Sequence, residues 1–65
     1  MNTAARLERE LLTPRQVAQV LELSRSRVYQ LLGAGDIRSV KVGASRRIPR
    51  HCLTEYIDTL IADAA

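Results

Sequence analysis

The chain has 65 residues, of which 46% are hydrophobic, a formal net charge of +3 and a single cysteine, Cys52. This length and composition permit one small folded domain, and they exclude a disordered chain, a disulfide-stabilised secreted mini-protein and a deep substrate cleft. No stretch approaches the roughly 20 apolar residues of a membrane span, so we expect a soluble protein of the reducing cytoplasm.

Residues 1–10 are predicted to form a polar tail ahead of a single domain that spans residues 11–65. A first helix is indicated by Thr13, which suits the N-cap position, followed by Pro14 at the first helical position and Gln16 as a capping-box partner. Apolar side chains then recur on one side of this helix, at Val17, Ala18 and Leu21. We expect that side of the helix to face the core.

A tight turn over residues 22–24 separates this helix from a second one, which Ser24 is suited to N-cap. Three apolar residues of the second helix share one face: Val28, Leu31 and Leu32. The opposite face carries small or polar residues, namely Ser26, Gln30 and Gly33, with Arg27 and Tyr29 at its flanks. The glycines of the run 33–35 are predicted to end the helix, because glycine tolerates a positive φ.

Beyond the second helix the hydrophobic period changes to the alternation typical of strands. Residues 39–42 and 47–48 are predicted to be two short strands joined by a hairpin loop, with residues 43–46 at its tip. Pro49 closes the hairpin, and a third helix follows. Its apolar residues recur at helical spacing: Leu53, Tyr56, Ile57, Leu60 and Ile61.

Positive charge is concentrated in residues 24–50, which net +6, whereas residues 1–23 net zero and residues 51–65 net −3. The central block holds one acid, Asp36, and seven basic residues: Arg25, Arg27, Arg38, Lys41, Arg46, Arg47 and Arg50. Clustering of this kind within a folded domain indicates a polyanionic partner.

Two helices joined by a three-residue turn and followed by a hairpin have the plan of a winged helix-turn-helix, in which the second helix lies in the DNA major groove. Arg25 and Arg27 stand at the N-terminus of that helix, where the helix dipole disfavours a cation unless an anion is near. The basic hairpin has the size to follow a phosphate backbone or to enter a minor groove. We therefore expect a mainly α fold with a small β-hairpin that binds double-stranded DNA.

The chain resembles the excisionase family of small winged helix-turn-helix proteins, which is related to the DNA-binding domain of MerR-type regulators. The resemblance covers about residues 11–61 and rests on four ordered motifs: LTPRQVAQVL, SRSRVYQLL, GDIRSVKVG and RRIPRHCLTEYI. It implies a recombination directionality factor of a bacterial host cell. Such a protein binds DNA in phage attachment regions, bends it, binds cooperatively beside other copies and directs an integrase towards excision, with no catalytic activity or cofactor of its own.

The implied DNA contacts fall into three groups. On the recognition helix they are Arg25, Ser26, Arg27, Tyr29 and Gln30. On the wing they are Ser45, Arg46 and Arg47, to which the charge pattern adds Lys41. Arg15 is expected to touch a phosphate, and we favour Arg27 over Arg25 as the residue that reads a base. Glu22 departs from the family, which more often has glycine in the turn, and this departure implies either mild strain or a slightly altered helix crossing.

Two other functions remain open. A small transcriptional regulator would share every DNA contact, and a protein-interaction adaptor would use the same scaffold without DNA. His51 and Cys52 lack the second ligand pair expected of a zinc site, and Glu55 and Asp58 are placed on a solvated face of the third helix. We therefore expect neither a metal site nor an enzyme.

Overall fold

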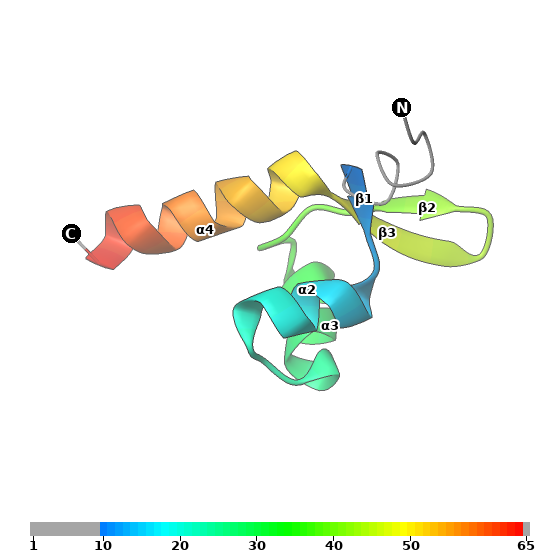
Figure 1. Cartoon of the computed structure of the whole chain (residues 1–65), viewed down its shortest axis with the longest axis horizontal. Helices are drawn as coiled ribbons and strands as arrows, with labels where there is room; N and C mark the ends of the chain where they lie inside the picture. The colour runs from blue at the N-terminus through cyan, green and yellow to red at the C-terminus, as the bar shows by residue number, and fades with distance from the viewer. Residues whose placement is uncertain (1–9, 65) are drawn as a thin grey trace, which may run out of the picture.

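A computed structural model describes residues 10–64 of the chain (Figure 1). The elements in chain order are β1 (Leu11–Leu12), α2 (Pro14–Leu21), α3 (Arg25–Ala34), β2 (Val40–Val42), β3 (Ser45–Pro49) and α4 (Arg50–Ala64). Residues 1–9 of the predicted tail lie outside the described residues. Within residues 10–64, no helix is both long and apolar enough to cross a membrane.

The start of α2 confirms the predicted capping box. The Thr13 hydroxyl accepts a hydrogen bond from the Gln16 backbone N–H at 3.0 Å, and the Gln16 side-chain oxygen accepts one from the Thr13 N–H at 2.9 Å. Two backbone donors that the helix itself cannot satisfy are thereby paired. Local sequence therefore determines where α2 begins.

Both α2 and α3 end in the same left-handed turn, but only one of them uses glycine. At the end of α3, Gly35 has φ 81°, and the Asp36 N–H donates to the Leu31 carbonyl at 3.0 Å. At the end of α2, Glu22 takes this position with φ 55° and ψ 43°, and the Leu23 N–H donates to the Ala18 carbonyl at 3.0 Å. Because Glu22 has a Cβ, it bears the steric cost that Gly35 avoids. Of the two alternatives expected at Glu22, the positive φ agrees with mild strain.

Replacing Glu22 by glycine should stabilise the fold by about 0.5–1 kcal/mol. The substitution removes a left-handed penalty of about 1–2 kcal/mol, while the greater flexibility of glycine in the unfolded chain returns part of that gain. Thermal unfolding should show a melting temperature a few degrees higher. The matched control is Gly35→Ala at φ 81°, which should lower the melting temperature. Unchanged or lowered stability in Glu22→Gly would contradict the assignment of strain to this turn.

The hairpin belongs to a three-stranded antiparallel sheet of order β1-β3-β2 (Figure 1). The two-stranded prediction missed β1, in which Leu11 pairs with Pro49 and Leu12 with Ile48. The predicted tip at residues 43–46 was also too long. Val42 pairs with Ser45, so the turn contains only Gly43, at φ 64°, and Ala44. This register moves the predicted contact residues of the tip onto strand β3.

Nine buried apolar residues from α2, α3, β3, α4 and the loop after α3 form the core: Val17, Ala18, Val28, Leu31, Leu32, Ile37, Ile48, Cys52 and Leu53. The predicted buried faces of the two turn-linked helices are confirmed, although Leu21 is only half-buried. Ile37 joins the core without any helical or strand periodicity that would have predicted it. Cys52 was left out of the predicted apolar face, although it lies four residues before Tyr56 on α4. The core thus lies between the α2–α3 pair and the inner face of the sheet.

The C-terminal helix uses only part of its apolar face for packing. Cys52 and Leu53 in its first turns are buried, and Tyr56 and Ile57 are half-buried. Further along the helix, Leu60 and Ile61 are 46% and 64% exposed. Figure 1 shows α4 extending away from the sheet in the direction opposite to the β2–β3 hairpin. The regular amphipathic pattern therefore predicted the helix correctly, but its distal apolar residues do not contact the core.

Candidate nucleic-acid interface

The turn between α2 and α3 positions the positively charged start of α3. Ser24 caps the helix, because its hydroxyl accepts a hydrogen bond from the Arg27 N–H at 3.1 Å. The first turn of α3 contains no acidic residue, and both Arg25 and Arg27 are exposed there. The helix dipole and two guanidinium groups therefore act at the same helix end. That combination attracts an anion.

The exposed face of α3 is lined by the predicted residues Ser26, Gln30 and Gly33, opposite the buried face. Arg27 Nη1 donates a hydrogen bond to Gln30 Oε1 at 3.1 Å, so this arginine is held by a neighbour one turn along the helix. A guanidinium restrained in this way retains further N–H donors in a fixed plane, as bidentate recognition of guanine requires.

Tyr29 has 54% of its surface exposed on α3 and is not one of the residues packed against the core. Gly33 has open space at its Cα, since an added Cβ would meet no atom within 4 Å. The absence of a side chain there is therefore not required by packing within the domain. It leaves the backbone of α3 accessible on the face that carries Ser26 and Gln30.

A surface hollow of about 440 Å³ brings Arg15 of α2 and Arg25 of α3 to one place. Its remaining lining residues are Ala18, Gln19 and Leu23. Two guanidinium groups and an amide around one hollow suit a phosphate group, which accepts several hydrogen bonds. The sequence predicted Arg15 and Arg25 separately but did not predict Gln19. The available signal was its position four residues after Arg15 on the exposed side of α2.

The strand register places the wing residues on two different faces of the hairpin. Lys41 lies opposite Arg46, and Val40 lies opposite Arg47. Because side chains alternate along a strand, Lys41 and Arg46 share one face, while Arg47 shares the other face with two exposed valines, Val40 and Val42. The predicted wing contacts therefore do not form a single surface. Ser45 lies on the Arg47 face, beside the turn.

Lys41 and Arg46, which carry like charges, stand directly opposite each other on their shared face of the hairpin. Such a cross-strand pair destabilises an antiparallel hairpin unless an anion lies between or beside the charges. Arg46 is also oriented by the protein, because its Nη1 donates to the Ser39 hydroxyl at 2.6 Å. Arg47 Nη1 donates instead to the Arg46 backbone carbonyl at 2.9 Å. The Lys41–Arg46 face is therefore a preformed cationic surface.

One member of the basic block is directed away from these groups. Arg38 Nη2 donates to both carboxylate oxygens of Glu55, at 2.7 and 2.9 Å. The interaction connects the loop after α3 to α4, and both side chains are more than half exposed. A surface pair of this kind contributes about 0–1 kcal/mol to stability. Arg38 is thus engaged with an acid, and Glu55 is not simply a solvated residue.

A family model described as a helix-turn-helix domain matches residues 11–60 of the chain. Over 55 residues, the chain is 33% identical to an excisionase from Streptomyces ambofaciens, in an alignment that covers 85% of this chain and 89% of that relative. The chain belongs to the excisionase family of helix-turn-helix proteins. As in the family plan, its two turn-linked helices constitute a DNA-binding domain, and β2 and β3 form the wing.

A second relative of this excisionase-family chain is a probable excisionase from Saccharopolyspora erythraea, which is 44% identical over 54 residues. The alignment covers 83% of this chain but 55% of that relative, so the chain spans only about half of its length. No solved structure matches the chain significantly.

Proposed function

We propose that this protein acts as a phage or prophage excisionase, which binds attachment-site DNA, bends it and directs an integrase towards excision. The observation that carries the proposal is a set of cationic side chains on α3 and the wing that have no acidic partner among residues 10–64. Arg27 is held by Gln30, Arg46 is held by Ser39, and Lys41 lies opposite Arg46. The protein contributes DNA geometry and contacts in this scheme, and the integrase performs the chemistry.

In the proposed complex, the exposed face of α3 enters the major groove. Arg27, oriented by Gln30, donates to a guanine, and Ser26 and Tyr29 contact neighbouring base or backbone atoms. The hollow between Arg15 and Arg25 receives a backbone phosphate at the edge of the groove. In this proposal Arg27 on α3 reads a base, whereas Arg15 and Arg25 bind the DNA backbone.

The wing is proposed to bind the adjacent backbone and minor groove. The Lys41–Arg46 face lies along phosphates, while Ser45, Arg47 and the exposed valines face the opposite wall of the groove. A hairpin that contacts both walls widens the minor groove, and such deformation bends a duplex. This arrangement explains why basic residues occur on both faces of the hairpin.

A single domain of this size reads few base pairs, so we propose that several copies bind side by side on the DNA. The distal apolar residues of α4, Leu60 and Ile61, are exposed and lie next to the acidic Asp58 and Asp63. This distal part of α4 is the proposed surface for a neighbouring copy or for the integrase. An excision assay with the integrase of the same element, supplemented with the wild-type chain or with Leu60→Ser/Ile61→Ser, tests that role.

The DNA-binding step is tested by the salt dependence of Arg46→Ala. Fluorescence anisotropy with a labelled attachment-region duplex, between about 50 and 200 mM salt, gives the slope of log K against log salt concentration. Loss of one phosphate contact should weaken binding to specific and scrambled duplexes alike and reduce the magnitude of the slope by about 1. Arg38→Ala is the matched control, because it removes the same charge from a residue engaged with Glu55. Wild-type binding that is absent or indifferent to salt would refute the proposed function.

A further inference from the structure

We infer that His51, Cys52 and Glu55 form a binding site for a divalent transition metal of the zinc class at the start of α4. One ligand atom from each residue, an imidazole nitrogen, the Cys52 sulfur and a carboxylate oxygen, lies within 4.8 Å of the other two. The sequence showed only the adjacent His51 and Cys52. The first turn of α4 brings Glu55 to them, because residues four apart lie on the same side of a helix.

The separation of the nitrogen and sulfur ligands matches tetrahedral coordination. Cys52 Sγ lies 3.6 Å from His51 Nε2. With Zn–S of about 2.3 Å and Zn–N of about 2.0–2.1 Å, a tetrahedral site places these two atoms about 3.6 Å apart. One thiolate, one imidazole and one carboxylate form a borderline donor set that suits Zn²⁺ or Co²⁺ rather than Mg²⁺ or Ca²⁺. Three protein ligands leave a fourth position for water.

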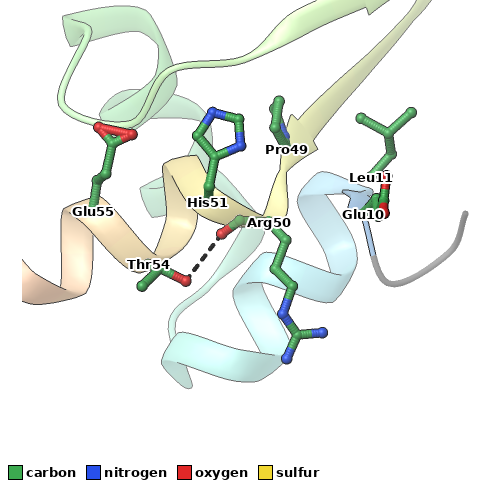
Figure 2. Close-up of a pocket in the computed structure, with 7 residues that line it drawn as sticks. All are labelled: Glu10, Leu11, Pro49, Arg50, His51, Thr54 and Glu55. Atoms are coloured by element: carbon green, nitrogen blue, oxygen red, sulfur yellow. Dashed lines mark hydrogen bonds between the residues drawn. The ribbon is translucent and has the colours of Figure 1, made fainter. Parts of the chain in front are cut away.

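The surroundings of the three residues provide both support and access. Cys52 is buried in the core, which fixes the sulfur, whereas His51 and Glu55 are exposed and leave a path from solvent. Figure 2 shows the His51 and Glu55 side chains on the same side of α4, with Arg50 pointing the other way. Both side chains also line a surface pocket whose apolar wall is formed by Leu11 and Pro49.

Arg38 provides the outer hydrogen bond that orients a ligating carboxylate. Its Nη2 contacts both oxygens of Glu55, so one oxygen can bind a metal while the other retains the arginine. A bound metal would then link the start of α4, through Glu55 and Arg38, to the loop that leads into the wing. This site is separate from the proposed DNA contacts and does not depend on them.

Binding involves proton release and no redox change. The S–H bond of Cys52 breaks, its proton passes to buffer, and the sulfur electron pair bonds to the metal. His51 binds as neutral imidazole, and the Glu55 carboxylate replaces a water ligand of the incoming ion. The net reaction releases one thiol proton per metal bound when the imidazole is already neutral.

The test is a Co²⁺ titration of the reduced full chain, followed by visible and near-ultraviolet absorption. We expect one equivalent of Co²⁺ to produce tetrahedral d–d bands and a thiolate-to-cobalt charge-transfer band, both of which Zn²⁺ abolishes by displacement. The exposed substitutions His51→Gln and Glu55→Gln should each weaken binding by at least about 10-fold. Asp58→Asn, on the same helix but outside the cluster, is the matched control and should bind as the wild type does.

Thermal unfolding gives a second measurement that does not require a change at Cys52. Zn²⁺ should raise the melting temperature of the wild type and of Asp58→Asn in a concentration-dependent manner, because it binds the folded state. The increase should be lost in His51→Gln and Glu55→Gln. Absence of a thiolate-to-cobalt band in the folded wild type, or wild-type affinity in Glu55→Gln, would overturn the inference.

Discussion

Replacing Arg27 by alanine is expected to weaken binding to the specific DNA site by about 5- to 150-fold, corresponding to about 1–3 kcal/mol for a bidentate base contact. The Arg27 guanidinium is held by Gln30 on the exposed start of α3, where a groove-reading side chain is needed. The affinity for a scrambled duplex should change much less, so the ratio of specific to scrambled affinity should fall. Competition anisotropy with the specific and scrambled duplexes measures both affinities.

Arg25→Ala is the matched control for Arg27→Ala. Arg25 lines the hollow with Arg15, and its loss should weaken both duplexes by similar factors and reduce the salt slope. If Arg27→Ala instead weakens both duplexes equally, Arg27 binds a phosphate and the assignment of the base contact is wrong. A double-mutant cycle of Arg27→Ala and Gln30→Ala should show that their effects on DNA affinity are coupled. Gln30 accepts a hydrogen bond from Arg27 and so orients its guanidinium group.

Replacing Ile48 by alanine is expected to lower the free energy of unfolding by about 2–5 kcal/mol. Ile48 is fully buried at 0% exposure and lies on β3, where it pairs with Leu12 of β1. A core of this size supplies only about 3–5 kcal/mol in total, so the variant should be largely unfolded near physiological temperature. Urea denaturation followed by circular dichroism at low temperature measures the loss.

Val42→Ala provides the comparison within the same hairpin. Val42 is 55% exposed near the turn, and its truncation should change the free energy of unfolding by no more than about 0.5 kcal/mol. A similar loss in both variants would show that the hairpin is not anchored to the core through Ile48. If Val42→Ala is as stable as expected, exposed positions near the hairpin turn can be substituted without unfolding the domain. A DNA-binding defect of such a variant then reports a lost contact.

Most of the helical framework is encoded in local signals and could be predicted without the structure. The Thr13–Gln16 capping box, the Ser24 cap and the Gly35 turn each depend on hydrogen bonds or backbone angles within a few residues. The same holds for the buried faces of α2 and α3, which follow from helical periodicity. The concentration of positive charge in residues 24–50 is likewise a property of composition, and it indicated a polyanionic partner.

Long-range pairing required the tertiary structure. β1 contains only two residues, too few to show an alternating pattern. It exists because Leu11 and Leu12 pair with Pro49 and Ile48 of β3, which are distant in the sequence. The register of the hairpin decides that Arg46 and Arg47 face opposite ways, since a shift of one residue would exchange their faces. A charge count cannot distinguish those two arrangements.

The same reason applies to the groups that the fold brings together. Arg15 and Arg25 line one hollow because α2 and α3 pack together, and Arg38 contacts Glu55 because the start of α4 lies beside the loop after α3. Local sequence thus determined the helices, their ends and the sign of the partner's charge. The tertiary structure decided which charged side chains share a surface, because that depends on contacts between residues far apart in the chain and on the register of the sheet.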